Sequence, residues 1–278
     1  MLNANMDIIF KKILDCLERE RRIDFSGLHP SMVQRRIDTR VIATGTCDYS
    51  RYLNFIEKFP EELDCLIDVL TINVSRFFRN SLVFEYLAKQ VLPGIIHEKN
   101  RSKDPVIRIW SAGCAKGEEA YSMAILLDDI MEKKPLRVEL FATDIDKSIL
   151  KKAALAEYGA DSIQSVKYRL LKKYFINETG IFRLVPEIKT KVLFSVYDLL
   201  SKKGYAPPES IYGSFDIIMC RNVLIYFDLR HQEMICRKMY KSLADQGLLV
   251  LGDVETPPGA YRRYFKQITT ACPIYRKA

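Results

Sequence analysis

Arg221 and Asn222 are polar residues that stand where an apolar strand should end. They follow the run 215–220, whose apolar residues are typical of a strand covered on both faces in a parallel sheet. In open α/β sheets, ligands bind beyond the carboxyl ends of such strands. The pair therefore indicates either a ligand at this edge, or a capped strand end in which Asn222 bonds loop backbone and Arg221 meets a surface carboxylate.

Two glycines and two glutamates follow another predicted strand, at 107–110. Gly113 and Gly117 allow backbone to approach a ligand closely, and Glu118 and Glu119 open the next predicted helix. The segment fits neither GxGxxG nor GxxxxGK[ST], and carboxylates at a helix start repel phosphate. The pattern favours a ligand with positive charge or hydroxyl groups. Alternatively, the two glutamates only complement the helix dipole.

Asp144 stands at the end of the next predicted strand, "RVELFATD". A carboxylate in this position can accept both hydrogen bonds from a ribose diol. The alternative is that Asp144 or Asp146 caps the helix beginning near Lys147. Together with the glycines and glutamates, Asp144 indicates a cofactor with a ribose and a cationic centre but no phosphates. S-adenosylmethionine meets that description.

The elements that position these residues alternate between strand and helix from about residue 105 onward. This βαβ pattern predicts a doubly wound parallel sheet. Short β-like runs around 178–180 predict a small antiparallel insertion at about 172–194. The first 80 or so residues instead have helical periodicity, with Pro30 as the expected first residue of one helix.

Charge and composition exclude several classes of protein. No apolar run reaches the roughly 18 residues that a membrane span needs, and no cleavable leader opens the chain, so we expect a cytoplasmic protein without membrane insertion. The seven cysteines form no CxxC pair and the three histidines lie in no metal or nucleophile motif, so no metal site is expected. The formal charge of +8 suits an acidic protein or a nucleic acid equally.

The basic residues of the helical region are concentrated in one part of it. Residues 19–40 hold six arginines and three acids, whereas residues 41–70 hold two basic residues and six acids. Arg35, Arg36 and Arg40 have the spacing of one outer helix face. They form either a solvated face or a surface that contacts a partner.

The chain resembles the CheR family of chemotaxis receptor methyltransferases over nearly its whole length. Seven segments carry the resemblance in order: "RRIDFSGLHPSMVQRRIDTR", "TINVSRFFRN", "WSAGCAKGEEAYSMA", "ATDIDKSILKKA", "VLFSVYDLL", "FDIIMCRNVLIYFD" and "GLLVLGDVE". The resemblance implies an all-α N-terminal domain at 1–74 and a Rossmann-like methyltransferase domain at 75–278, interrupted by the insertion. It implies methyl transfer from S-adenosylmethionine to receptor glutamates, with S-adenosylhomocysteine as the second product.

The resemblance also implies roles for individual residues. It implies that the cofactor is bound by Asn73, Ser75, Arg79, Gly113, Glu118 or Glu119, Asp144, Asp198, Leu199, Arg221 and Asn222. Asp198 and Leu199 are expected beside the adenine, and Arg79 and Tyr226 beside the transferred methyl group as the catalytic pair. Asp198 departs from the asparagine frequent in the family, and Ser75 departs from the frequent threonine.

The implied partner is the helical cytoplasmic domain of methyl-accepting chemotaxis receptors, with Arg35, Arg36 and Arg40 against its acidic surface. The hairpin "INETGIFRL" looks short for gripping a receptor C-terminal pentapeptide, so we expect no strong tether.

A nucleic-acid methyltransferase is an alternative, but "NVLIYF" lacks the proline of an NPPY-like motif. A non-catalytic S-adenosylmethionine-binding adaptor is another, and the presence of Arg79 and Tyr226 argues against it.

Overall fold

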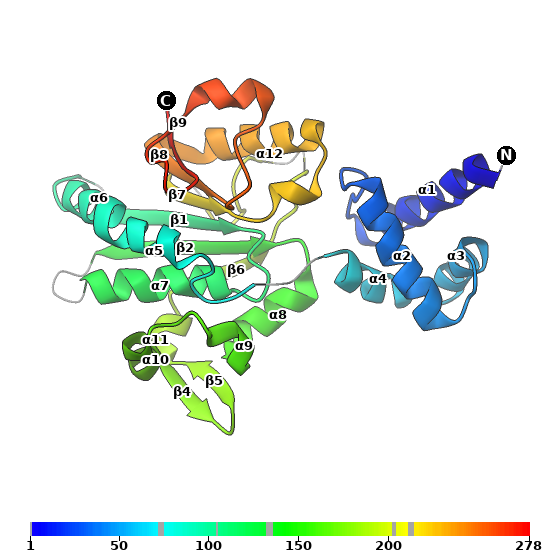
Figure 1. Cartoon of the computed structure of the whole chain (residues 1–278), viewed down its shortest axis with the longest axis horizontal. Coiled ribbons are helices and arrows are strands. Elements are labelled where there is room, and N and C mark those ends of the chain that lie inside the picture. Colours follow the sequence, from blue (N-terminus) through cyan, green and yellow to red (C-terminus); the bar gives the residue numbers. More distant parts are fainter. Residues whose placement is uncertain (1, 72–74, 104, 132–135, 202–203, 211–213) are drawn as a thin grey trace. The chain divides into compact units, whose positions relative to one another are not determined.

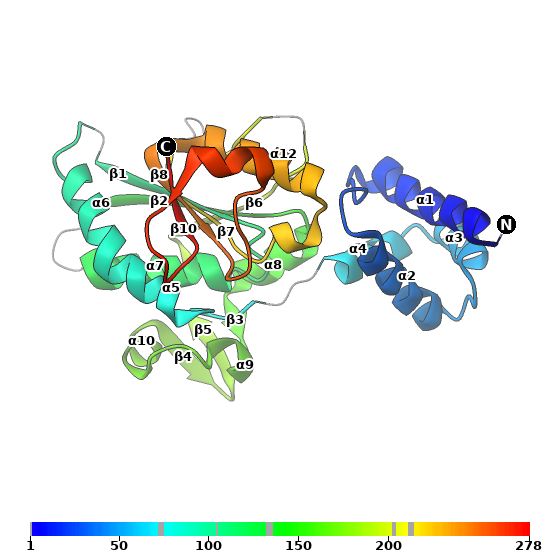
Figure 2. The ribbon, with the colours of Figure 1, turned by 45° about the horizontal axis from the view of Figure 1, so that its top comes forward.

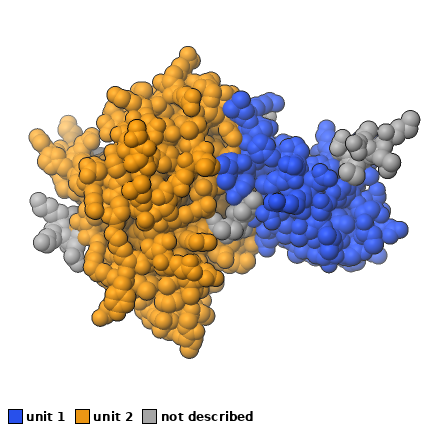
Figure 3. Space-filling view, in the orientation of Figure 1, with its two compact units in different colours: residues 1–73, 225–231 blue, residues 74–224, 232–278 orange. Residues whose placement is uncertain are grey.

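The helical and the α/β regions of the sequence form two units in the computed structural model. The described residues are 2–71, 75–103, 105–131, 136–201, 204–210 and 214–278. Unit 1 comprises Met1–Asn73 and Ile225–His231, and unit 2 comprises Val74–Leu224 and Gln232–Ala278 (Figure 3). The predicted cofactor residue Asn73 lies outside the described residues.

The described part of unit 1 is mainly helical, and Figure 1 labels its helices. They are α1 (Leu2–Arg21), α2 (Pro30–Thr44), α3 (Tyr49–Lys58) and α4 (Glu62–Leu70). Helix α2 begins at Pro30 as predicted, because a first helical residue needs no backbone N–H, and it ends at Gly45 in the left-handed conformation, with φ of 68°. The apolar faces of the helices share one core, which includes Leu17, Ile37 and Leu66.

Segment 225–231 packs with the helices of unit 1. The N–H of His29 donates to the carbonyl oxygen of Tyr226 at 3.0 Å, and the N–H of Asp228 donates to the carbonyl oxygen of Gly27 at 3.1 Å. These residues therefore belong to unit 1, although the chain on both sides of them belongs to unit 2.

Arg40 is partly buried and pairs with a buried carboxylate of unit 1. Its guanidinium donates to both carboxylate oxygens of buried Glu62, at 2.7 and 2.8 Å, and the hydroxyl of Tyr52 donates to the same carboxylate at 3.0 Å. Removing one partner of such a buried pair typically costs about 3–5 kcal/mol. This pairing corrects the expectation that three arginines share an outer face: Arg35 is exposed and Arg36 is partly buried.

Unit 2 contains a seven-stranded sheet in the order β6-β2-β1-β7-β8-β10-β9. The strands are β1 (Val106–Ala112), β2 (Arg137–Asp144), β6 (Val192–Val196), β7 (Phe215–Cys220), β8 (Leu243–Leu251), β9 (Phe265–Gln267) and β10 (Ile274–Lys277). Strands β6, β2, β1, β7 and β8 run parallel, while β10 is antiparallel to both β8 and β9. The predicted doubly wound α/β fold is confirmed.

Helices cover both faces of this sheet (Figures 1 and 2). One face carries α5 (Ser81–Tyr86), a π-helical turn η1 (Leu87–Val91), α6 (Leu92–Lys99), α7 (Glu118–Met131) and α8 (Lys147–Leu155). The other face carries α12 (Leu229–Ser242) and the 3-10 helix η3 (Gly259–Tyr264), and the short 3-10 helix η2 (Leu224–Tyr226) follows β7. Trp110 and Phe215 are fully buried within the sheet core.

The predicted antiparallel insertion is a separate three-stranded sheet in the order β3-β5-β4. Its elements are β3 (Glu157–Tyr158), α9 (Ala160–Ile163), α10 (Tyr168–Tyr174), β4 (Phe175–Glu178), β5 (Ile181–Leu184) and α11 (Pro186–Lys189). Positive φ angles at Thr179 and Gly180 make the tight hairpin between β4 and β5. The sheet begins earlier than the expected residue 172, because β3 pairs with β5, and the run 192–196 belongs to the large sheet instead.

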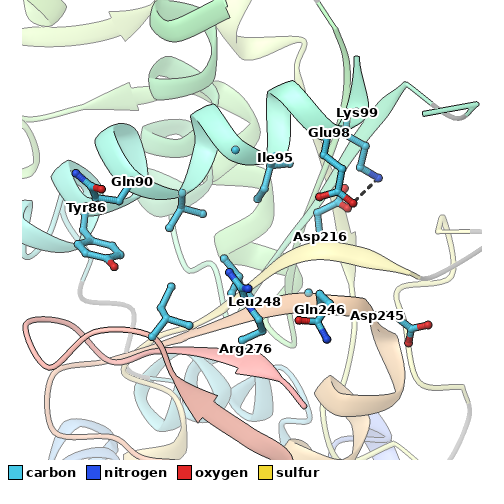
Figure 4. Close-up of a pocket in the computed structure, with 14 residues that line it drawn as sticks. Tyr86, Gln90, Ile95, Glu98, Lys99, Asp216, Asp245, Gln246, Leu248 and Arg276 are labelled. Atoms are coloured by element: carbon cyan, nitrogen blue, oxygen red, sulfur yellow. Dashed lines mark ion pairs between the residues drawn. The ribbon is translucent and has the colours of Figure 1, made fainter. Parts of the chain in front are cut away.

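A groove of about 750 Å³ lies between α5–α6 and strands β7, β8 and β10 (Figure 4). Lys99 and Asp216 form an ion pair of 2.8 Å across it. Asp216 and Gln246 stand at the amino ends of β7 and β8, so the groove opens at the edge opposite the carboxyl ends of the parallel strands.

Across the described parts of the chain, we find no helix of the length and apolarity that crossing a bilayer requires.

Candidate active site

The polar residues predicted at strand ends meet at one edge of the large sheet. Ala112 of β1 pairs with Thr143 of β2, and Asp144 pairs with Val196 of β6. The described candidates in unit 2 therefore share this edge or adjoin it: Ser75, Arg79, Gly113, Glu118, Glu119, Asp144, Asp198, Leu199, Arg221 and Asn222. Tyr226 and the three arginines of α2 belong to unit 1 and are described there.

The loop after β1 is fixed to the end of β2. The N–H groups of Gly113 and Cys114 donate to the carbonyl oxygen of Thr143 at 2.8 and 2.9 Å. Gly113 has φ of 71°, and a Cβ there would lie 2.6 Å from a methyl group of Val223. Only glycine fits this turn, and its backbone remains close to the end of β7.

The two aspartates after β2 have different tasks. Asp146 caps α8, because its Oδ1 accepts the N–H groups of Ser148 and Ile149 at 2.8 and 3.1 Å. Asp144 is 8% exposed and accepts the N–H groups of Ala115 and Asp146 at 2.9 and 3.1 Å. Burial raises the pKa of Asp144, although those backbone donors oppose the shift. Asp144 is therefore not needed as the helix cap.

The two glutamates that open α7 also differ. Glu119 accepts the hydroxyl of Ser111 at 2.8 Å and pairs with Nη1 of Arg221 at 3.2 Å. Glu118 is 1% exposed, and its Oε1 accepts the hydroxyl of Ser162 at 3.4 Å. Its Oε2 is buried without a hydrogen-bond partner among the described residues. Burial raises the pKa of both carboxyl groups, and in Glu119 the charge of Arg221 opposes the rise.

Arg221 pairs with an interior carboxylate, so the interpretation of Arg221 as a surface cap is wrong. Its side chain is 2% exposed, and besides Glu119 it donates from Nη2 to the carbonyl oxygen of Arg79 at 2.8 Å. The guanidinium also lies 5.6 Å from the ring centre of Phe84. Arg221 therefore joins the end of β7 to the start of α7 and to the segment that carries Arg79.

Asn222 adopts a left-handed conformation, with φ of 59°. Its N–H donates to Oε2 of Glu255 at 2.7 Å, and the same oxygen accepts the N–H of Gly252 at 2.6 Å. Glu255 is 4% exposed and thus fixes the loop after β7 to the loop after β8. Sequence reasoning did not single out Glu255, although it ends the segment "GLLVLGDVE".

Segment 75–80 enters this edge in a constrained conformation. The N–H of Phe77 donates to the carbonyl oxygen of Ser162, and that of Phe78 to the hydroxyl of Ser122, both at 2.9 Å. Phe78 and Asn80 have φ of 51° and 57°, which few non-glycine residues adopt. Arg79 lies between these two residues and is exposed.

The loop after β6 has its own internal support. Asp198 accepts the N–H of Leu200 at 2.8 Å, and Leu199 is 9% exposed. Lys238 of α12 donates to the carbonyl oxygens of Ser201 and Asp198 at 2.8 and 3.4 Å. Burial lowers the pKa of Lys238 to about 8. No local sequence signal distinguishes Lys238 from the other basic residues of α12.

The charges at this edge fit a cationic cofactor with hydroxyl groups. Glu118 and Asp144 are buried, Glu119 is 12% exposed, and burial raises the pKa of all three carboxyl groups; Arg221 pairs with Glu119. A ligand that brings positive charge and hydroxyl donors stabilises their ionised forms. The sulfonium, ammonium and ribose of S-adenosylmethionine meet this requirement.

Comparison with known proteins gives the same family for both units. Residues 8–71 match the family described as CheR methyltransferase, all-alpha domain, and residues 73–272 match CheR methyltransferase, SAM binding domain. The chemotaxis protein methyltransferases of Salmonella typhimurium and Escherichia coli are 34% and 33% identical, each over 94% of this chain and 88% of the relative. That of Borreliella burgdorferi is 32% identical over 92% of each chain.

The raised pKa values predict that cofactor affinity depends on pH. Glu118, Glu119 and Asp144 take up protons at higher pH than exposed carboxyl groups do, and a cationic ligand binds their ionised forms more tightly. Affinity for S-adenosylmethionine should therefore fall as pH falls from 7 to 5, by about tenfold per pH unit for each proton taken up. Calorimetric titration across this range measures the effect.

S-adenosylhomocysteine provides the comparison, because it keeps the ammonium and ribose but lacks the sulfonium charge. Its affinity should also fall as pH falls, and the difference between the two slopes measures the contribution of the sulfonium. Equal affinities for S-adenosylmethionine at both ends of the range would contradict the electrostatic account of this edge.

Proposed function

Because the chain belongs to the CheR methyltransferase family, we propose that it transfers the methyl group of S-adenosylmethionine to glutamate side chains of methyl-accepting chemotaxis receptors. The observation that supports this most is the carboxylate-lined strand edge with an exposed arginine, Arg79, beside it. The products are glutamyl methyl esters and S-adenosylhomocysteine. Since the methylated domain of such receptors is cytoplasmic, the enzyme acts in the cytoplasm.

Glu119 is the better candidate for the ammonium of the cofactor. Its side chain is 12% exposed, whereas Glu118 is 1% exposed and interacts with Ser162 and Ser75. Each carboxylate oxygen has two lone pairs, so Glu119 can accept a further donor while keeping Arg221. Glu118 then connects α7 to the segment that carries Arg79.

The other cofactor contacts follow from the strand ends. Asp144 is the candidate for the ribose hydroxyls, and Asp198 and Leu199 are the candidates for the adenine, with Asp198 accepting from its exocyclic amine. Gly113 allows close approach of backbone. Asn222 borders the same edge, where Glu255 holds it.

The reaction needs no general base. A glutamate carboxylate, with a reference pKa of about 4.3, is already the anionic nucleophile at neutral pH. When bound, the cofactor supplies a methyl carbon activated by its sulfonium. The carboxylate oxygen forms a bond to that carbon as the carbon–sulfur bond breaks, and no proton moves.

The protein residues therefore work by positioning. Holding the reacting atoms in line at about 3–3.5 Å and excluding water can lower the barrier by up to about 7–11 kcal/mol. Arg79 orients the incoming carboxylate, and Arg221 fixes the backbone of Arg79 through its carbonyl oxygen. The resemblance to the family assigns Tyr226 the role of shaping the approach of the carboxylate to the methyl group. Arg79 and Tyr226 are thus the proposed catalytic residues.

The chemical stability of the transferred label tests the reaction. The full chain is incubated with labelled S-adenosylmethionine and a receptor cytoplasmic fragment, and the labelled fragment is then treated with mild base. Glutamyl methyl esters hydrolyse under base, whereas N-methyl groups persist. Label that survives base would reject the glutamate assignment.

An Arg79→Ala variant tests the catalytic role of Arg79 in the same assay. At saturating S-adenosylmethionine it should turn over at less than about a tenth of the wild-type rate, a loss above about 1.4 kcal/mol. Turnover by the variant at more than about a tenth of the wild-type rate would contradict a catalytic role for Arg79.

Arg35 and Arg36 are the proposed contacts for the acidic receptor surface. Arg35 is exposed on α2, and Arg36 is partly exposed, with its Nε buried. Arg40 forms an ion pair with Glu62, so its guanidinium connects α2 to α4 inside unit 1. The proposed surface is therefore narrower than the three arginines of the sequence suggested.

Charge reversal at Arg35 tests this surface. An Arg35→Glu variant should raise the KM for the receptor fragment by about tenfold at low salt, and the difference should shrink at 0.5 M salt, because exposed charges are then screened. Arg51→Glu on α3 is the matched control, since its side chain is 70% exposed in the same unit. Equal KM values for the two variants would exclude Arg35 from the receptor surface.

The three-stranded sheet is proposed not to act as a strong receptor tether. Strand β4 is an edge strand, but it has four residues and ends in a tight hairpin, which leaves few backbone groups for an added strand. Calorimetric titration of the full chain with the C-terminal pentapeptide of its receptor should show a Kd no tighter than about 1 mM. Micromolar binding would overturn this part of the proposal.

A further inference from the structure

A tight turn displays one apolar side chain beside the candidate active site. The turn spans residues 252–255, and the N–H of Glu255 donates to the carbonyl oxygen of Gly252 at 3.0 Å. Val254, at the centre of the turn, is 81% exposed. Turn centres usually hold glycine, proline, asparagine, aspartate or serine, so a β-branched apolar residue is unusual there.

The other side chains of the turn hold it in place. The carboxylate of Glu255 accepts the N–H of Gly252 within the turn and that of Asn222 from the neighbouring loop, at 2.6 and 2.7 Å. The carboxylate of Asp253 accepts the side-chain amide of Asn80. Val254 is thus presented on a backbone that is fixed from two sides.

These hydrogen bonds place the turn next to the proposed catalytic arginine. Asn80 directly follows Arg79 in the chain, and Asn222 directly follows Arg221, which holds the carbonyl oxygen of Arg79. A second exposed apolar residue, Leu82, lies two positions beyond Asn80 and is 52% exposed. Each partner of the Asn80–Asp253 hydrogen bond therefore has an exposed apolar residue close to it in the chain, Leu82 after Asn80 and Val254 after Asp253.

Isolated exposed apolar residues are common and need no explanation by themselves. Val254 differs because its backbone is held rigid before any partner binds. A rigid apolar contact loses little conformational entropy on association, which makes it effective in recognition. Because Asp253 accepts the amide of Asn80, the turn that carries Val254 is hydrogen-bonded to the residue directly after Arg79.

We propose that Val254, with Leu82, forms an apolar docking contact for the methyl-accepting segment of the protein substrate. This inference rests on the proposed function. The chemistry it fits is an amphipathic helix in which an apolar side chain lies three or four residues from the target glutamate, because residues at this spacing share one helix face. Val254 is then a determinant of which glutamates are methylated, and Arg79 acts on the carboxylate itself.

Replacing Val254 with serine tests the contact. Burying one valine side chain against a partner corresponds to about a tenfold change in affinity, so Val254→Ser should raise the KM for the receptor fragment by about tenfold. The kcat at saturating fragment, the Kd for S-adenosylmethionine and the thermal midpoint should stay at wild-type values. Val254→Ile keeps an apolar tip and should restore the wild-type KM.

Leu155→Ser is the matched control, because Leu155 is 58% exposed at the end of α8 in the same unit. It should leave the KM unchanged. If the wild type methylates the fragment, the proposed function stands. An unchanged KM in Val254→Ser, or a loss of cofactor affinity alongside the change in KM, would then overturn the docking contact alone. A wild-type enzyme that leaves no base-labile methyl groups on the fragment would overturn both.

Discussion

The buried ion pair between Glu119 and Arg221 is the interaction on which the candidate active site depends. It joins the first turn of α7 to the end of β7, two elements about 100 residues apart in the chain. Taking either charge away would leave the other unpaired in the interior, which typically costs about 3–5 kcal/mol. Because Arg221 also holds the carbonyl oxygen of Arg79, the same pair sets the backbone position of the residue proposed to meet the substrate. Electrostatics at this edge thus support both the proposed cofactor site and the proposed position of Arg79.

The features that the sequence predicted well have local signatures. The apolar run before Arg221, the glycines after β1 and the acid after β2 mark strand ends, and parallel strands bring their carboxyl ends to one edge. The sequence left open whether Asp144 or Asp146 caps α8, because both stand close to its first residue. The structure separates them through hydrogen-bond geometry, since the carboxylate of Asp146 accepts the first N–H groups of the helix.

The features that the sequence could not predict depend on contacts between distant residues. Glu255 meets Asn222 across 33 positions and Lys238 meets Asp198 across 40, and neither contact leaves a periodic pattern. Likewise, Arg35 and Arg40 look equivalent in the sequence of α2. Only the packing of α4 against α2 shows that Arg40 forms an ion pair with Glu62. The small sheet began earlier than expected for the same reason, because a two-residue strand has no signal without its partner.

Segment 225–231 gives the chain an unusual covalent topology. Neither unit is one continuous stretch of sequence, since the backbone leaves the α/β unit after Leu224, pairs with residues 27–29, and returns at Gln232. A fragment that begins at residue 75 would carry this segment without its hydrogen-bonding partners, and a fragment that ends at residue 71 would lack those seven residues altogether. A cut between residues 71 and 75 therefore breaks hydrogen bonds inside unit 1 as well as the covalent link between the units.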